Sequence, residues 1–384
     1  MKNTLFCAAL SVTTVVTALS GCNENTPSTA KPSTAKPSIV KKVESDYETV
    51  LTVLTEDFIV PAYSNFEAKT AQLSQSIKTQ CKVDANNSDE NNITIDWQSL
   101  QQNWKAVSFA WQDISWLQIG PISSSNRLHR VQYWPDANNA VERGTQQLLS
   151  SDSELNLTSL AKMNVGAQGI PALERLIFQA SLHQQTDAKA LCTSLVLVSE
   201  NLAGIASAVS TQWSASDNGF AQATIGGLAP FTNQKDALEE LVSNVAAYIS
   251  RIKDNKIIYP LSIQAPGIPM LGEAPFADSS PAHIQHNVAA IRAVLGTSDK
   301  HGLCYLLVQN QQQALASQLK NNLETLDELA NQLQTSYASA LADEEQRLVL
   351  TNLSNSLTAL QTLLSESIVP ALSLNLGFNS LDGD

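Results

Sequence analysis

Apolar residues recur at steps of three and four along most of this 384-residue chain, and this spacing constrains the fold more than any other feature. One series is Leu100, Trp104, Val107, Trp111 and Ile114, and further series run through 195–213, 238–252, 315–333 and 350–364. Such steps place apolar side chains on one face of an α-helix, and that face has to be buried against other helices. No convincing series with the two-residue period of a strand occurs. The sequence therefore predicts an all-α protein.

Two stretches interrupt the helical pattern, at 118–136 and at 214–234. The second is rich in Gly, Ala, Ser and Asn, and about four helical segments lie on each side of it. We therefore predict two antiparallel four-helix bundles, one over 44–216 and one over 217–384. Pro61 lies inside an apolar series near the start of the first bundle, and we expect it to kink or restart the helix there.

Residues 1–21 have the pattern of a lipoprotein signal peptide. Lys2 precedes an uncharged apolar run over 4–19, which is too short to span a bilayer comfortably and ends in Leu-Ser-Gly before Cys22. A plain signal peptide would share the charge and the apolar run, but small residues before a cysteine favour lipid attachment to Cys22. Acyl chains on this residue would anchor the mature protein to a membrane without a spanning helix.

The predicted anchor implies a location in the cell envelope, facing the periplasm. Asn23 follows the cysteine, where an aspartate would signal retention in the inner membrane, so the outer membrane is favoured over the inner one. Residues 22–43 contain a tandem STAKP repeat, and their proline and small polar residues cannot build a core. We expect this segment to be a disordered tether.

The charge balance argues against nucleic acid as a partner. The chain has 23 Lys and Arg against 36 Asp and Glu, a net charge of −13, whereas phosphate contacts need basic side chains. Zinc-protease HExxH, nucleophile-elbow GxSxG, P-loop and dinucleotide GxGxxG motifs are all absent from the sequence. Cys81, Cys192 and Cys304 remain after the signal and anchor cysteines, which permits one disulfide in an oxidising compartment and leaves one thiol over.

Two segments contain candidate ligand-binding residues. In the first, Pro171 is well placed as the first residue of a helix, and Glu174 would then lie in its first turn. Glu174 is there either as a carboxylate favoured by the helix dipole or as a ligand-contacting group in a cleft. The second segment, 130–136, contains four candidate side chains. They are explained either by packing, with the aspartate as the cap of the next helix, or by a binding site. These side chains are Arg130, Tyr133, Trp134 and Asp136.

A third segment contains two histidines. Ser280 and Pro281 have the order of a helix N-cap and first residue, so His283 and His286 would lie three apart on one helical face. They are either surface residues or a metal-binding pair. The last nine residues, LGFNSLDGD, do not have a helical pattern and are expected either to dock on the fold or to fray.

These segments together resemble the imelysin family, over roughly residues 45–384. The resemblance is carried by Gly120-Pro121, RVQYWPD at 130–136, GIPALERLIF at 169–178, the helix start at 280–287 and LGFNSLDGD at 376–384. It implies two helical bundles with a cleft between them, and iron-linked periplasmic biology, since the chain is also similar to the periplasmic component of a ferrous iron uptake system.

The resemblance implies roles for particular residues. The family motif GxHxxE would make Glu174 a metal ligand, with iron as the implied metal. Gly169 and Glu174 match the motif, but Pro171 stands at the histidine position, and proline cannot coordinate a metal. The resemblance also implies a disulfide between Cys81 and Cys192, which leaves Cys304 outside the pair.

We therefore expect a binding component linked to iron uptake, which takes iron, haem or another ligand into the cleft. The residues expected to contact the ligand are Glu174, Arg130, Tyr133, Trp134, Asp136 and, in the tail, Asn379. One alternative is a metallopeptidase, which the missing histidine disfavours. Another is a non-enzymatic interaction module for an envelope protein or a polysaccharide, on which Tyr133 and Trp134 would stack.

Overall fold

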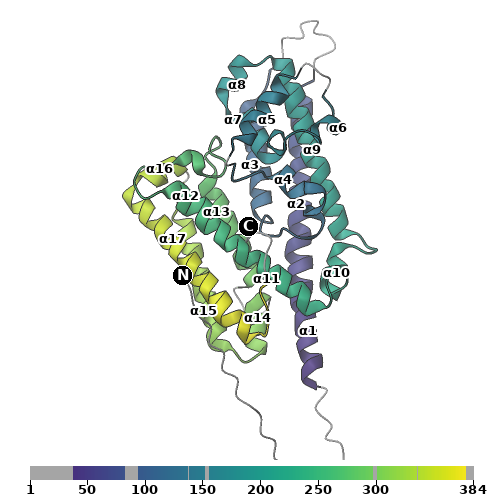
Figure 1. The fold of residues 1–384 in the computed structure, drawn as a ribbon, viewed down its shortest axis with the longest axis vertical. Coiled ribbons are helices and arrows are strands. Elements are labelled where there is room, and N and C mark those ends of the chain that lie inside the picture. Colours follow the sequence, from purple (N-terminus) through teal and green to yellow (C-terminus); the bar gives the residue numbers. More distant parts are fainter. Residues whose placement is uncertain are drawn as a thin grey trace, which may run out of the picture. The chain divides into compact units, whose positions relative to one another are not determined.

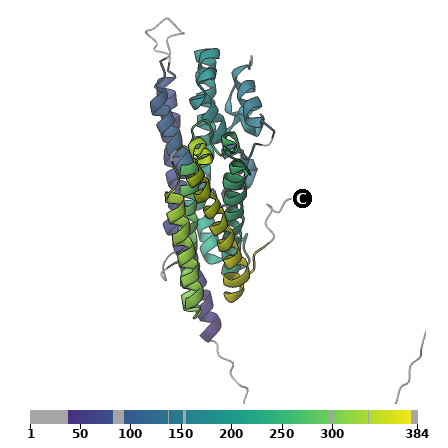
Figure 2. The same cartoon turned by 90° about the vertical axis from the view of Figure 1, so that its left-hand side faces the viewer.

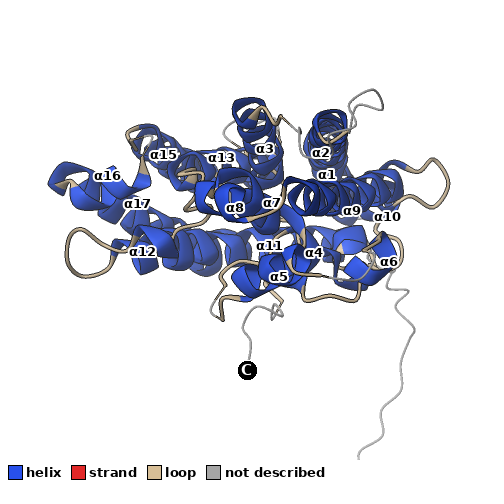
Figure 3. Ribbon diagram, turned by 90° about the horizontal axis from the view of Figure 1, so that it is seen from above, coloured by secondary structure: helices blue, strands red, loops and turns tan. Residues whose placement is uncertain are grey.

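The computed structural model describes residues 38–82, 94–136, 138–151, 155–296, 301–334 and 336–377. Every regular element in these ranges is helical, as the uniform blue of Figure 3 shows. The predicted all-α class is confirmed. Cys22, the tether segment up to residue 37 and Asn379 lie outside the described residues.

The helices before residue 217 pack around one long rod. In that rod α1 (Ser38–Val53), the π-helical segment η1 (Leu54–Ile59) and α2 (Val60–Gln80) follow one another end to end. Figure 1 shows α9 (Ala188–Ser214) alongside α2, and α3 (Trp97–Gln112) packs against α2 from another side. The predicted apolar face of α3 is buried throughout, from Leu100 to Trp111. Two further helices, α5 (Ala140–Leu149) and α7 (Gly169–Phe178), pack against each other and against α9.

The helices after residue 217 form a second group. Its members are α11 (Gln234–Arg251), η5 (Ile252–Ile258), α13 (Ser280–Leu295), α14 (Gly302–Gln309), α15 (Gln313–Asn331), α17 (Glu344–Leu363) and η7 (Leu364–Ile368). Figures 1 and 2 show α15 and α17 side by side. The leucines predicted to form the face of the last long helix, at 350, 353, 357, 360 and 364, are fully buried.

Short helices and turns make up the other regular elements of the described ranges. They are α4 (Arg127–Val131), α6 (Leu157–Leu160), α8 (Ala180–Gln185), α10 (Phe220–Gly226), α12 (Tyr259–Leu261), α16 (Tyr337–Ala342), α18 (Val369–Ala371) and the 3₁₀ turns η2 (Gly120–Ile122), η3 (Ser124–Asn126), η4 (Val165–Ala167) and η6 (Pro269–Leu271). Residues from Val40 onward form one compact unit, in which α3 packs on α13. The boundary at residues 216 and 217 stays a prediction.

Each of three prolines follows a π-helical segment. Pro61, Pro260 and Pro370 are the second residues of α2, α12 and α18, directly after η1, η5 and η7. A proline ring in a regular helix clashes with the carbonyl four residues earlier, and the wider π turn moves that carbonyl away. At Pro61 the helix therefore continues through a π segment, where the sequence predicted a kink or a restart.

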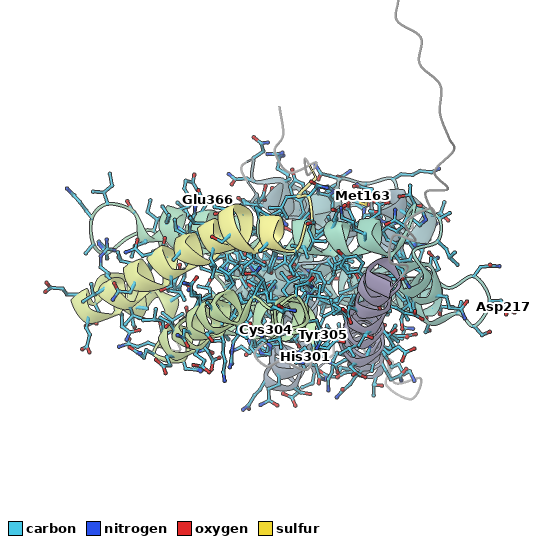
Figure 4. All side chains as sticks on the ribbon, turned by 90° about the horizontal axis from the view of Figure 1, so that it is seen from below. Met163, Asp217, His301, Cys304, Tyr305 and Glu366 are labelled. Atoms are coloured by element: carbon cyan, nitrogen blue, oxygen red, sulfur yellow. A yellow bond between two sulfur atoms is a disulfide. The ribbon has the colours of Figure 1, made fainter. Side chains whose placement is uncertain are left out.

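The predicted disulfide between Cys81 and Cys192 is confirmed. It joins the end of α2 to the first turns of α9, with 5.4 Å between the Cα atoms. Cys304 is buried and outside this pair. Figure 4 shows Cys304 with Tyr305 and His301 beside α1, where the Tyr305 hydroxyl lies 3.3 Å from Asp46 Oδ1.

Two other features concern surfaces of the fold. Among the described helices, α9 alone is long and apolar enough to cross a membrane, and 61% of the qualifying window is buried inside the protein, as in a core helix. The C-terminal tail starts along α11, where the backbone N–H of Asn375 donates to Glu239 Oε1 over 2.7 Å. Residues 378–384 lie outside the described residues.

Candidate functional site

Glu174 is a buried carboxyl group on α7, with 4% of its surface exposed. The helix begins at Gly169, two residues before the proline that the sequence suggested as its first, so Glu174 lies in the second turn and not in the first. The dipole of the first turn therefore does not explain this residue. Its Oε1 accepts hydrogen bonds from the backbone N–H groups of Phe276 and Ala277, at 2.7 and 2.9 Å. No hydrogen bond to Oε2 is made by any described residue.

A cavity of about 330 Å³ lies in front of Glu174. Residues from both groups of helices line it. The first group contributes α7 and the segment after α4, and the second contributes the segment between α12 and α13. Burial raises the pKa of Glu174 to about 7, although the N–H groups of Ala277 and Phe276 act in the opposite direction. This carboxyl group therefore takes up or releases a proton near neutral pH.

Gly169 brings the two candidate segments together. Its φ is +73°, and a Cβ there would lie 2.2 Å from the carbonyl oxygen of Val131, so only glycine allows α7 to begin this close to the end of α4. The indole N–H of Trp104 donates to Ile170 O over 3.0 Å and fixes the same turn to α3. The residues after Val131 are thereby held against α7.

Four of the predicted site residues line this cavity, namely Tyr133, Trp134, Asp136 and Glu174. Both carboxylate oxygens of Asp136 accept backbone N–H groups of α5, from Ala140 and Val141, each at 2.8 Å. Asp136 therefore anchors that helix start, and its hydrogen-bonding capacity is largely used.

Arg130 does not line the cavity. Its guanidinium donates to Gln168 Oε1 over 2.9 Å and to Asn201 Oδ1 over 2.7 Å. These contacts fasten α4 to α9 and to the residue before α7. The sequence placed Arg130 with the ligand-contacting residues, whereas the structure gives it contacts with the protein itself.

A second buried cluster lies next to the cavity, and the sequence analysis did not identify it. Lys256 of η5 has 2% of its surface exposed, and its Nζ donates to Glu273 Oε2, Asn287 Oδ1 and Gln112 Oε1 over 2.7, 2.7 and 2.8 Å. Gln112 belongs to α3, so this ammonium group ties the two groups of helices together. The Nε2 of Gln132 donates to Glu273 Oε1 over 3.0 Å and connects the cluster to the cavity wall.

His283 extends this cluster. Its Nδ1 lies 2.8 Å from Glu273 Oε2, and its Nε2 lies 2.8 Å from Ser108 Oγ. Burial alone would raise the pKa of Glu273, but Lys256 and His283 together outweigh it and hold that pKa well below its usual range. Burial lowers the pKa of His283, with Glu273 acting in the opposite direction.

Ser108, His283 and Glu273 have the order of a nucleophile, a base and an orienting acid. The Ser108 side chain, however, has no exposed surface and does not line the cavity, and Glu273 is shared with Lys256. A reacting carbonyl group therefore has no place beside the hydroxyl. In this structure the three residues connect α3 with α13.

The cluster had a signal in the sequence. Lys256 follows Ile252 by four residues and so continues the apolar face of α11, and Ser108 and Gln112 continue the face of α3 from Trp104 in the same way. Polar residues on a face that must be buried need partners inside the protein. The sequence gives no indication of which residues those partners are.

The two histidines of α13 have separate partners. The helix starts at Ser280 with Ser279 as its cap, one residue earlier than predicted. His283 is buried, whereas the half-exposed His286 pairs with Asp113 over 2.7 Å. Within the described ranges, no group of three His, Cys, Asp or Glu side chains could hold a metal ion.

The residues around Glu174 do not fit a transition-metal ion either. Pro171, one turn before it, offers no ligand atom, and one carboxyl oxygen is occupied by two N–H donors. A single carboxylate does not hold such an ion firmly without further ligands.

Comparison with known proteins identifies one family, and two solved structures illustrate the likeness of fold. The family model described as imelysin matches residues 59–364. An imelysin-like protein from Psychrobacter arcticus 273-4 superposes with a TM-score of 0.70 and 23% identity, over 87% of this chain and 98% of that one. A protein from Parabacteroides distasonis ATCC 8503, named as a putative iron-regulated protein A precursor, superposes with a TM-score of 0.65 and 15% identity. The match covers 89% of this chain and 96% of that one. No curated protein matches the chain.

Proposed function

Because the chain belongs to the imelysin family, we propose that it is a binding protein of the cell envelope that takes a small ligand into the cavity beside Glu174. The observation that carries this proposal is the second carboxyl oxygen of Glu174. It belongs to a buried side chain, has no partner among the described residues and faces a cavity large enough for a small molecule. This oxygen is not among the fully buried atoms that lack a partner, so it stays open to the cavity, and a ligand that bonds to it takes the place of water.

The location outside the cytoplasm is supported by two independent features. The first is the signal sequence with Cys22 as the lipid-anchored residue, followed by the proline-rich segment up to residue 43. The second is the disulfide between Cys81 and Cys192, since disulfides persist in oxidising compartments. We place the protein on a membrane facing the periplasm, with the outer membrane favoured.

A role in iron uptake is the finer part of the proposal. Its support is the likeness to the Parabacteroides protein, whose name says that it is iron-regulated. The residues around Glu174 do not fit a bare iron ion, so the ligand that we propose is a molecule bound by its organic groups. The metallopeptidase alternative loses its basis for the same reason, because Glu174 has no histidine beside it.

A calorimetric titration of the full-length protein in detergent tests the binding function. Ferrous ion, ferric ion, haem and small organic amines and acids are titrated into the wild-type protein and into Glu174→Gln. Glu324→Gln on α15 is the matched control, since this side chain is about half exposed and does not line the cavity. The proposal requires at least one ligand whose affinity changes in Glu174→Gln and not in the control. If no ligand meets this condition, the cavity is not the binding site.

A docking function is the second candidate, and one surface feature favours it. Side chains of the segment 258–270 are unusually exposed for apolar residues: Ile263 at 97%, Tyr259 and Met270 at 59%, Ile258 at 47% and Ile268 at 46%. Tyr259 and Met270 also line the cavity, so a partner on this surface would lie at its entrance. A photocross-linking residue at Ile263 tests this, and an absence of adducts in intact cells would contradict it.

A further inference from the structure

The cavity beside Glu174 has more acidic than basic groups in its wall. Its carboxyl groups are Asp136, Glu142 and Glu174, against the single guanidinium of Arg175. Arg175 lies 3.5 Å from Glu142 and 5.0 Å from the centre of the Phe276 ring, so its charge is shared with these groups, while its buried Nε–H has no hydrogen-bond partner. The wall therefore favours a positively charged ligand over a negatively charged one.

Apart from exposed or half-exposed side chains such as Glu142, two carboxyl or amide groups of the wall have an acceptor oxygen with no partner among the described residues, namely Gln132 Oε1 and Glu174 Oε2. Asp136 is occupied by the N–H groups of α5, and both ring nitrogens of His283 have partners at 2.8 Å. Of the two oxygens without such a partner, only Glu174 Oε2 can carry a negative charge, and its side chain is more than nine-tenths buried. An ammonium group supplies the donors and the charge that such an oxygen binds best.

The rest of the wall is largely aromatic and apolar. Tyr133, Trp134 and Tyr259 line it together with Pro171 and Met270. Aromatic rings attract cations through their faces and also pack against flat apolar groups. A ligand with a charged head and an apolar body fits both the carboxylate and the aromatic part of this wall.

We propose that the cavity binds an organic cation: a primary ammonium group bonded to Glu174 Oε2, with its apolar body against Trp134 and Tyr259. This inference rests on the proposed binding function and adds the chemical class of the ligand. An anionic ligand would lose its hydration next to a carboxylate and gain only the guanidinium of Arg175, which already faces Glu142. Carboxylate-bearing ligands such as haem are therefore poor fits.

Proton linkage follows from the state of Glu174 before binding. Because burial raises its pKa to about 7, the empty site is partly protonated at neutral pH, and a cation binds the ionised form. Binding should release a proton, and the affinity should fall about tenfold for each pH unit below 7 and level off above it. The other titratable groups around the cavity and behind Glu174 are Tyr133, Asp136, Glu142, Arg175, Lys256, Tyr259, Glu273 and His283.

Three probes with the same ring test the charge preference: tryptamine as the cation, tryptophol as the neutral analogue and indole-3-propionate as the anion. Each is titrated into the full-length protein in detergent at pH 8 and at pH 6. We expect tryptamine to bind at least tenfold more tightly than the other two at pH 8 and about tenfold more weakly at pH 6 than at pH 8. Titration in two buffers with different ionisation enthalpies should report proton release near pH 7, and this measurement needs no variant.

Variants then locate the charge. Glu174→Gln should abolish the preference for tryptamine, whereas Glu324→Gln should keep it. Equal or tighter binding of the neutral or anionic probe, no binding of tryptamine, or tryptamine binding that Glu174→Gln leaves unchanged overturns the inference. If haem or indole-3-propionate binds and depends on Glu174, the binding function holds and only the ligand class is wrong. If no ligand depends on Glu174, both fail.

Discussion

The burial of Glu174 should make the stability of the protein depend on pH, and this dependence can be measured without any ligand. An acid whose pKa is raised from its ordinary 4.5 to about 7 in the folded protein holds its proton longer when folded than when unfolded. Stability therefore falls as pH rises from about 4.5 to 7 and stays level above, with a total loss of about 3 kcal/mol. Glu174→Gln is uncharged at every pH and keeps an oxygen for the two backbone N–H groups.

We therefore expect Glu174→Gln to gain about 2–3 kcal/mol over the wild type on going from pH 5 to pH 8. Urea unfolding of both proteins at the two pH values measures this difference, in which the contributions of Glu273 and His283 largely cancel. Glu324→Gln should give no such difference. A pH-independent gap between Glu174→Gln and the wild type would mean that the buried carboxyl group does not titrate in this range.

Lys256 and Glu273 form a buried ion pair at 2.7 Å, and removing one partner leaves the other charge uncompensated. Lys256→Met should lower the free energy of unfolding by about 3–5 kcal/mol. The double variant Lys256→Met/Glu273→Gln should lose less than the sum of the two single variants, because it leaves neither charge behind.

The matched control for this pair is Lys235→Met, which removes an exposed lysine 3.4 Å from Glu239. A surface pair of this kind contributes about 1 kcal/mol or less. Chemical denaturation of the wild type and of the four variants provides the comparison. Additive losses at Lys256 and Glu273 would argue against direct coupling in the folded protein.

At the scale of elements, the sequence predicted the helices well, because each apolar series requires a buried face. The apolar series from Leu100 to Ile114 and from Leu350 to Leu364 are buried as their spacing indicates. It did not predict the π segments, since the response of a helix to Pro61 depends on what packs around it. Helix starts were displaced by one or two residues, at Ser280 and at Gly169, as is usual for helix ends.

The candidate site was only partly predictable for a related reason. The segments around Trp134 and Glu174 stand out by composition, and the structure places both at one cavity. The donors to Glu174, however, come from Phe276 and Ala277, about a hundred positions along the chain. Backbone N–H groups carry no sequence signature, and neither does the partner of a buried lysine. Tertiary packing alone supplies those contacts.

The disulfide between α2 and α9 permits a prediction about these two elements. It closes a loop of 111 residues, so its removal should cost about 4–5 kcal/mol in the chain-entropy account. The double variant Cys81→Ser/Cys192→Ser should melt at a lower temperature than the wild type. Dithiothreitol should lower the melting temperature of the wild type to that of the variant and leave the melting temperature of the variant unchanged. If the variant responds to the reductant in the same way, the effect does not come from this bond.

At the scale of the whole molecule, the proposed lipid anchor and the helical body have separate requirements. The body has its own core from Val40 onward, and its disulfide needs an oxidising compartment during folding. The proposed anchor needs only the signal sequence and Cys22. A change at Cys22 should therefore alter the location of the protein without altering its stability or its ligand binding.

Cys22→Ser tests this separation. Serine lacks the thiol that receives the diacylglycerol. The variant should therefore lose its lipid label and should not be anchored to the membrane. Fractionation and metabolic labelling with a radioactive fatty acid measure both effects, and Cys304→Ser, at a buried position, serves as the control that keeps its label. Calorimetry on the unlipidated protein should then give the same affinity for tryptamine as the lipidated form, because the cavity is built entirely from residues of the helical body. A lipid label that persists in Cys22→Ser would place the anchor elsewhere in the chain.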